Sequence, residues 1–149
     1  MDANTKRINH IKVKNTISNL EKNNIKAVYV ETKEEALTLF KTMVPPGSYT
    51  ATGGSMTLRD TGIIDYLMSD TDYHKEYKDA YDASFYVLSA NAITENGEIF
   101  QVDGRSNRVS AMLFGPEKVI VVAGINKLVP TLREAAIRLK NIAAPMNAT

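Results

Sequence analysis

Residues 48–58 read SYTATGGSMTL and combine an extended segment, a glycine pair and the start of a helix within one short stretch. Residues 48–52 are predicted to be extended. The pair Gly53-Gly54 then breaks the strand and allows the backbone to turn sharply. Apolar residues at helical spacing predict a helix over residues 56–68. The stretch therefore predicts a strand, a tight turn and a helix, the repeating unit of α/β proteins.

The same alternation of types runs along the rest of the chain. Helices are expected at residues 5–23, after the capping residue Thr32, at 108–114 and at 131–142. Strands are expected at residues 26–30, 84–89, 99–102 and 118–123, the last with the apolar pattern of a buried parallel strand. Residues 73–82 have no clear pattern, and residues 91–97 read as a polar loop. The predicted fold class is α/β, an open and mainly parallel sheet with helices on both faces.

Composition describes one ordinary globular domain of 149 residues and 16.5 kDa. We expect a single domain over residues 1–149, because the sequence shows no linker or repeat. The net charge of +1 argues against a nucleic-acid partner. There are no cysteines, which excludes disulfides and thiolate metal sites. The longest apolar run, residues 119–125, is too short to cross a membrane, and the amino terminus has no apolar signal core, so a soluble cytoplasmic protein is expected.

Three turns that follow predicted strands are candidate ligand sites, because open parallel sheets bind ligands at the carboxyl ends of their strands. The first is Gly53-Gly54-Ser55. Its N–H groups and the Ser55 hydroxyl suit a phosphate or carboxylate. It matches neither the dinucleotide-binding pattern nor the phosphate loop. The alternative is a tight turn in which Ser55 only caps the next helix.

The second turn follows the strand at residues 84–89. Asn96-Gly97 predicts a hairpin that returns the chain to Asp103. Asn91 and Asp103 are therefore candidate polar groups near a ligand. In the alternative interpretation Asp103 is a turn residue and the two glutamates of the hairpin are solvated charges.

The third turn, Gly124-Ile125-Asn126-Lys127, follows the strand at residues 118–123. It presents a backbone turn, an amide and an ammonium group that can pair with an anion. The alternative for Lys127 is an ordinary surface lysine.

Four further charged or titratable residues could contribute to ligand or metal binding. Arg105 and Arg108 suit carboxylate or phosphate recognition, although either can equally serve in a salt bridge. His10 and His74 have no acidic or hydroxyl partner at a recognisable spacing. We therefore expect no metal site.

Six weak motifs stand in a fixed order along the chain. They are residues 53–58 (GGSMTL), 91–94 (NAIT), 102–104 (VDG) with 107–109 (NRV), 114–116 (FGP) with 118–122 (KVIVV), 124–127 (GINK), and 143–145 (AAP) with 147–148 (NA). This ordered series, which covers residues 20–148, resembles the LUD domain family. The family was formerly a domain of unknown function and includes the lactate-utilisation protein C group.

The resemblance implies a NagB/RpiA/CoA-transferase-like fold and a role in lactate utilisation or related organic-acid metabolism, alongside iron–sulfur oxidoreductase partners. Other members of that superfold isomerise sugar phosphates or transfer CoA, with their ligands at the glycine turns. Carried onto this chain, the candidate ligand-binding residues are Gly53, Gly54, Ser55, Asn91, Asn107, Arg108, Gly124, Asn126 and Lys127. Asp103 is the candidate acid or base if the site is catalytic.

The sequence departs from the family pattern in three places. Residues 69–83 are shorter than the polar helical insert of relatives. Residues 104–107 read GRSN, where relatives tend to place Thr-Gly between the glycine and the asparagine. The cysteine-rich tail of many relatives is not found up to Thr149.

Two hypotheses for function follow, and the sequence leaves open whether the protein is an enzyme. The first is a component that binds a small anionic ligand at the carboxyl edge of the sheet. The alternative is a non-catalytic assembly or regulatory subunit that docks onto iron–sulfur oxidoreductases. No cofactor is expected within the chain, no membrane partner is expected, and self-association is left open.

Overall fold

The computed structural model describes residues 2–143, which form two compact units. Unit 1 comprises the residues up to Tyr29, Ala90–Gln101 and the residues from Gly124 on. Unit 2 comprises Val30–Ser89 and Val102–Ala123. The chain passes four times from one unit to the other, so both are built from segments distant in sequence. The single domain expected from the sequence stays a prediction.

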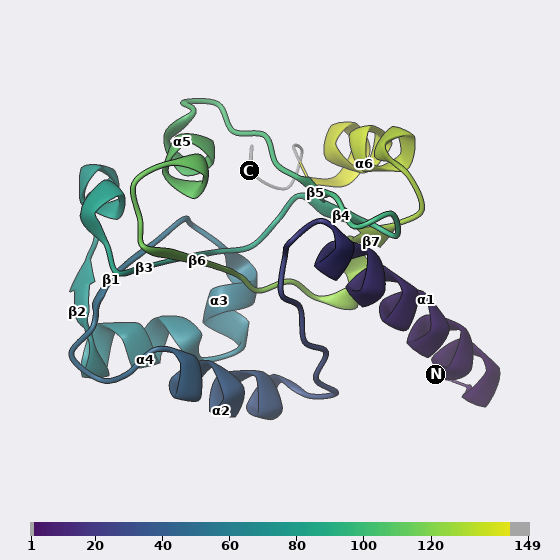
Figure 1. Cartoon of the computed structure of the whole chain (residues 1–149), viewed down its shortest axis with the longest axis horizontal. Helices are drawn as coiled ribbons and strands as arrows, with labels where there is room; N and C mark the ends of the chain where they lie inside the picture. The colour runs from purple at the N-terminus through teal and green to yellow at the C-terminus, as the bar shows by residue number, and fades with distance from the viewer. Residues whose placement is uncertain (1, 144–149) are drawn as a thin grey trace. The chain divides into compact units, whose positions relative to one another are not determined.

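Unit 2 is built on a four-stranded parallel sheet (Figure 1). Its strands are β1 (Tyr49–Thr52), β2 (Asp72–His74), β3 (Phe85–Leu88) and β6 (Lys118–Val121). Their order is β2-β1-β3-β6, with parallel pairing throughout. This confirms the predicted open, mainly parallel α/β fold. Because the chain moves from β1 to one side and then returns to the other, the strand order reverses between β1 and β3, the place where such sheets bind ligands.

Helices lie on both faces of this sheet, as predicted (Figure 1). The elements are α2 (Lys33–Met43), α3 (Met56–Asp60), α4 (Ile63–Asp70), the 3₁₀ helix η1 (Tyr77–Asp82) and α5 (Asn107–Leu113). On one face Val87 packs with Phe40 and Leu67, from α2 and α4. On the other face Tyr86 packs with Ala80 and Ala111, from η1 and α5. Alternate residues of β3 thus enter two separate apolar clusters.

Local signals in the sequence account for the boundaries of two of these helices. The Thr32 hydroxyl accepts a hydrogen bond from the N–H of Glu35, 3.1 Å away, and so caps α2 as expected. The single helix predicted over residues 56–68 is wrong, because the chain breaks between α3 and α4. Gly62 has a φ of 80°, a left-handed conformation that interrupts the helical path.

Two predictions for strands are corrected by the structure. Residues 26–30 form no strand, because this segment carries the chain out of unit 1, and Val28 is 64% exposed rather than packed on a sheet. Strand propensity needs a partner strand and a buried face. The strand near residue 120 is parallel, but β6 is an edge strand on which Lys118 and Val119 are exposed. It is therefore less buried than its apolar pattern predicts.

Unit 1 combines a long helix with a small three-stranded sheet. Its elements are α1 (Ala3–Lys22), β4 (Ala92–Thr94), β5 (Ile99–Phe100), the 3₁₀ helix η2 (Ile125–Lys127), β7 (Leu128–Val129), α6 (Leu132–Arg138) and a π-helical turn (Leu139–Ala143). Strand β4 pairs antiparallel with β5 and parallel with β7. The predicted hairpin at Asn96-Gly97 is confirmed. However, β4 occupies part of the predicted polar loop, and β5 ends at Phe100 instead of residue 102.

Helix α1 is held against this hairpin by two asparagines and a glycine. The Asn19 side chain donates to the Glu95 carbonyl at 2.7 Å, and the Asn23 side chain donates to the Gly97 carbonyl at 2.8 Å. Gly97 has a φ of 84°, and a Cβ there would lie 2.4 Å from the Asn19 carbonyl carbon. Only glycine allows the turn to approach the helix this closely. Nearby, Glu98 accepts a hydrogen bond from the buried Thr94 hydroxyl at 2.8 Å, so it is not merely a solvated charge.

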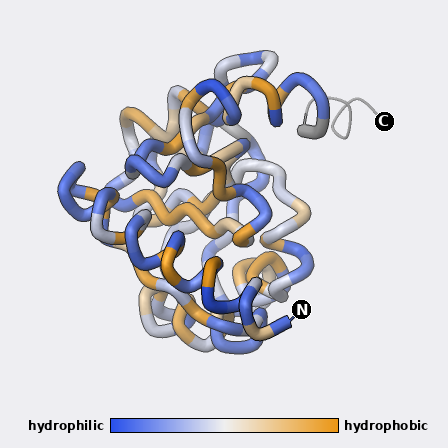
Figure 2. Tube along the Cα trace, turned by 90° about the vertical axis from the view of Figure 1, so that its right-hand side faces the viewer, coloured by the Kyte–Doolittle hydropathy of each residue, from blue (hydrophilic) through white to orange (hydrophobic). Residues whose placement is uncertain are grey.

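The hydropathy of the chain changes over short distances. Figure 2 shows hydrophobic stretches in orange repeatedly interrupted by hydrophilic ones in blue. Within residues 2–143, no helix combines the length and apolar character that a membrane span requires.

Candidate functional site

The candidate site of unit 2 lies where Gly53 leaves β1, next to the carboxyl end of β3. The Gly53 N–H donates to the Val87 carbonyl at 3.0 Å, which extends the pairing of β1 and β3 by one residue. Gly53 is buried and Gly54 is exposed. The two glycines therefore carry the chain from the sheet to the surface at the point where the strand order reverses.

Gly53 is tightly covered by two side chains from elsewhere in unit 2. A Cβ at this position would lie 3.0 Å from the Tyr86 hydroxyl oxygen and 3.1 Å from Cδ of Arg108. The residues come from β3 and from the first turn of α5. Three segments thus converge at the carboxyl edge, and their approach depends on the missing side chain at residue 53.

Arg108 brings a positive charge to this edge. Its Nη1 donates to the Gly54 carbonyl at 3.5 Å, which is long for a hydrogen bond. Within the part of the chain that the structure describes, no carboxylate oxygen lies within 4.0 Å of its guanidinium nitrogens. The guanidinium is half-buried and retains donors that can bind an anion.

Tyr86 is a site residue that sequence reasoning missed. The residue is 2% exposed, and its hydroxyl has no hydrogen-bond partner among residues 2–143. Burial raises the pKa of Tyr86 to about 12, with Arg108 lowering it and Asp103 raising it. The hydroxyl is therefore neutral at physiological pH and can donate a hydrogen bond. The only signal in the sequence was that a tyrosine in a buried strand carries a polar tip that needs a partner.

Asp103 organises the loop that leads into α5. Its Oδ1 accepts the N–H of Arg105 at 3.0 Å, and its Oδ2 accepts the N–H of Val109 at 2.9 Å. Desolvation raises the pKa of Asp103, but these hydrogen bonds, one from Ser106 and the charge of Arg108 outweigh it and hold the pKa below its usual value. A carboxylate bonded at both oxygens is a weak proton acceptor, and the geometry favours the interpretation of Asp103 as a turn residue.

Ser55 and Asn107 lie at the starts of two helices, α3 and α5. The Ser55 hydroxyl accepts the N–H of Thr57 at 3.1 Å and caps α3. This is the alternative that the sequence left open for Ser55. Asn107 is the first residue of α5 and is half-buried.

A second group of predicted residues gathers in unit 1 around Arg138, which sequence reasoning also missed. Arg138 Nη1 donates to the Asn91 carbonyl at 2.9 Å, and Nε donates to the Asn126 carbonyl at 3.3 Å. At Gly124 a Cβ would lie 2.5 Å from Oδ1 of Asn126, so this amide folds over the glycine. The predicted turns at residues 91 and 124–127 are thus tied together by one side chain of α6.

Lys127 belongs to the same group. Burial lowers the pKa of Lys127, and the nearby positive charge of Arg138 lowers it further. Lys127 is half-buried rather than a fully exposed surface lysine. The predicted residues therefore form two groups, one within each unit: Gly53, Gly54, Ser55, Asp103, Asn107 and Arg108 in unit 2, and Asn91, Gly124, Asn126 and Lys127 in unit 1.

The expectation that neither histidine has an acidic partner is wrong for His74. Its Nε2 lies 3.1 Å from Oδ1 of Asp72, and its Nδ1 lies 3.5 Å from Oδ2 of Asp79. The ring also stacks on Tyr49, with 4.0 Å between the ring centroids. The contacts of His74 could not be predicted from the sequence, because β2 is a three-residue strand without a clear sequence pattern. The cluster of His74, Asp72 and Asp79 does not have the arrangement of a metal site, and neither does any other group of His, Cys, Asp or Glu residues in the described ranges.

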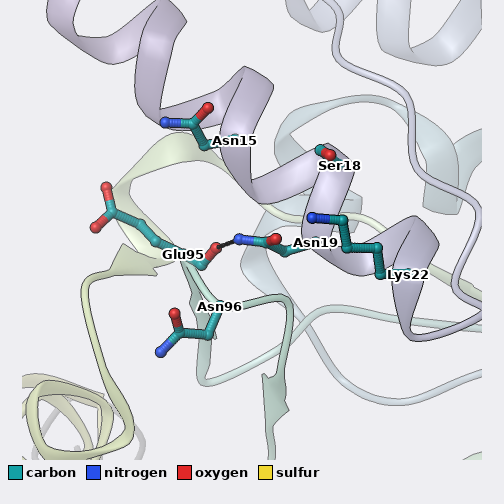
Figure 3. A pocket seen from close by; sticks show the side chains of 6 residues that line it. All are labelled: Asn15, Ser18, Asn19, Lys22, Glu95 and Asn96. Carbon is teal, nitrogen blue, oxygen red and sulfur yellow. Dashed lines mark hydrogen bonds between the residues drawn. The ribbon is translucent and has the colours of Figure 1, made fainter.

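Two surface hollows lie in unit 1. One, of about 410 Å³, is polar and lies between α1 and the hairpin turn, where Figure 3 shows Asn19 reaching toward Glu95. Its lining residues are Asn15, Ser18, Asn19, Lys22, Glu95 and Asn96. The other, of about 310 Å³, is mainly apolar and runs along α1. It is lined by His10, Ile11, Val13, Lys14, Ile17 and Tyr29.

Comparison with known protein families gives a match over most of the chain. The sequence model of the LUD domain matches residues 13–149, which is most of the chain. The last of the six motifs, beyond residue 143, lies outside the residues that the structure describes. Neither a curated protein nor a solved structure matches the chain.

Proposed function

This chain belongs to the LUD domain family, and we propose from that premise that it binds a small organic anion at the carboxyl edge of the sheet of unit 2. The family is associated with lactate utilisation, and we place the ligand among the organic acids of such metabolism. One observation carries the proposal: the Arg108 side chain lies over Gly53 at the point where the strand order reverses, with no carboxylate within 4.0 Å among the described residues.

The charges around Arg108 support a singly charged ligand. Hydrogen bonds between a guanidinium and a carboxylate contribute about 1.5–3 kcal/mol. Asp103 offsets part of the positive charge, so the site does not resemble the multiply cationic pockets that suit phosphates. The Gly53 N–H is used by Val87, and the N–H of the exposed Gly54 is the first backbone donor left for a ligand.

Asp103 is proposed here as a positioning residue rather than an acid or base. Its two carboxylate oxygens bind the loop and the start of α5, which fixes the helix that carries Arg108. We propose Asn91, Asn126 and Lys127 as polar contacts of a second anion-binding surface, within unit 1, where Lys127 and Arg138 concentrate positive charge.

The experiment that tests the proposed function is a titration of the full chain with acetate, propanoate, pyruvate and L-lactate. Binding is measured by chemical-shift changes and by the rise in melting temperature, since ligands of the folded state stabilise it. Arg108→Gln removes the charge and is expected to abolish binding. Arg105→Gln is the matched control, because Arg105 lies in the same loop and is exposed. Absence of binding by the wild type, or equal binding by Arg108→Gln, contradicts the proposal.

The second candidate function is a non-catalytic subunit that docks onto an iron–sulfur oxidoreductase. The observation that favours it is the apolar groove along α1, beside which Ile11 is 53% exposed. Ile11→Asp is expected to abolish co-elution with a purified iron–sulfur oxidoreductase from the same cell. The matched control is Lys12→Asp, on an exposed neighbouring position of the same helix. No co-elution with the wild type contradicts this candidate.

A further inference from the structure

Tyr86 carries a feature that anion binding by Arg108 does not explain. The residue is 2% exposed, and its hydroxyl has no hydrogen-bond partner among residues 2–143. The Tyr86 oxygen is not among the fully buried side-chain atoms that lack a partner, so it keeps a small accessible surface. The hydroxyl is therefore a donor at the edge of the core that a ligand can still reach.

The position of the hydroxyl favours a ligand group. The Tyr86 hydroxyl oxygen, Cγ of Arg108 and Cδ of Arg108 all lie within 3.2 Å of the point where a Cβ on Gly53 would stand. The hydroxyl and the arginine side chain thus meet beside the same glycine. Because residue 53 has no side chain, no methyl group separates the hydroxyl from the arginine side chain.

Neighbouring polar groups do not compete for the Tyr86 proton. The Tyr81 hydroxyl is paired with the Ser110 hydroxyl at 2.6 Å. Both oxygens of Asp103 accept backbone N–H groups. The donor that remains is a neutral hydroxyl next to a cation.

We propose that Tyr86 is a specificity-determining residue of this site, whose hydroxyl donates a hydrogen bond to an uncharged oxygen of a ligand that binds Arg108 through its carboxylate. This inference rests on the proposed function and narrows it. The substrate class is an organic acid with a carbonyl or hydroxyl oxygen next to the carboxylate. A simple carboxylic acid of the same length meets the cation but leaves the hydroxyl unpaired, and the site should discriminate against it.

The test uses two probes that differ in the oxygen at carbon 2, pyruvate and propanoate. The wild type is expected to bind pyruvate about 3–10 times more tightly, the range that one hydrogen bond supplies. Tyr86→Phe should reduce this ratio to about one and leave propanoate binding unchanged. Tyr81→Phe is the matched control, because its hydroxyl is paired with Ser110 and the ratio should stay at the wild-type value.

A second measurement does not depend on the folding of a variant. In wild-type protein labelled at tyrosine Cζ, the Tyr86 resonance should shift with pyruvate and stay in place with propanoate. Two outcomes overturn the inference about Tyr86 while the proposed function stands. In the first, propanoate binds through Arg108 but Tyr86→Phe keeps the preference for pyruvate. In the second, the Cζ resonance of Tyr86 does not shift when pyruvate binds. If neither probe binds the wild type, the proposed function fails, and the inference fails with it.

Discussion

The hydroxyl oxygen of Tyr86 lies 3.0 Å from the point that a Cβ on Gly53 would occupy. Real Cβ atoms rarely approach an oxygen this closely, so an added methyl group at residue 53 must move the tyrosine, the arginine or the glycine turn. The candidate site and the packing of the carboxyl edge therefore depend on the same missing side chain.

Gly53→Ala is expected to weaken the binding of pyruvate at least tenfold and to lower the free energy of unfolding by about 1–3 kcal/mol, because the new methyl group overpacks the site. Titration and chemical denaturation measure the two effects. Gly54→Ala is the matched control, since a Cβ at residue 54 meets no atom within 4 Å. Wild-type affinity in Gly53→Ala would show that Gly53 does not shape the site.

Asp103→Asn is expected to destabilise the protein by about 1–2 kcal/mol, because the amide keeps one acceptor oxygen where the carboxylate has two, each bonded to an N–H. The pKa of Asp103 is lower in the folded than in the unfolded state. Its contribution is thus present above the usual value of 3.8 and is lost as the pH falls through the folded pKa. Denaturation of both proteins should show their difference shrinking below that pH. A constant difference down to strong acid would contradict this role.

Tyr86→Phe is expected to change how stability depends on alkaline pH. An unfolded tyrosine loses its proton near pH 10, whereas the pKa of folded Tyr86 is about 12. The unfolded state therefore binds fewer protons between these values, and stability falls with rising pH by up to about 1.4 kcal/mol per pH unit. Urea denaturation should show the wild type losing stability relative to Tyr86→Phe between pH 10 and 12. Parallel curves for the two proteins would contradict the raised pKa.

Gly97→Ala is expected to cost about 3 kcal/mol or more, because its Cβ would enter the backbone of α1 at Asn19 and its φ of 84° disfavours a side chain. Gly47→Ala separates the two causes. Gly47 has a φ of 82°, but a Cβ there meets nothing within 4 Å, so only about 1 kcal/mol of backbone strain is expected. Equal losses in the two variants would mean that the contact between the hairpin turn and α1 contributes little.

The fold was largely predictable because most elements carry local signals. Thr32 caps α2, and the apolar runs around Val87 and Ile120 form parallel strands as expected. The break between α3 and α4 at Gly62 was not predicted, because a single glycine within an apolar helical pattern is compatible with an unbroken helix. Strand β2 was not predictable, since its three residues form a strand only by pairing with β1.

The candidate site could be predicted from the sequence only in part. Gly53 and Arg108 are candidates in the sequence because a glycine turn after a strand and a cation are visible there. Tyr86 was missed because its importance depends on which face of β3 it occupies and on how closely Gly53 approaches. Arg138 was missed because it reaches Asn91 across 47 residues of sequence, a contact that no local pattern encodes.

Because the chain passes four times between the two units, the parts of each unit become available for folding at different times during synthesis. Helix α1 leaves the ribosome well before the hairpin, because the carbonyl that accepts the hydrogen bond of its Asn19 side chain follows 76 residues later. Every strand of the parallel sheet has been made once Ala123 has been added, whereas the hairpin of unit 1 still waits for β7. A nascent chain can therefore pair all four strands of the sheet that contains Tyr86, and form the helix α5 that carries Arg108, before β7 completes the sheet of unit 1.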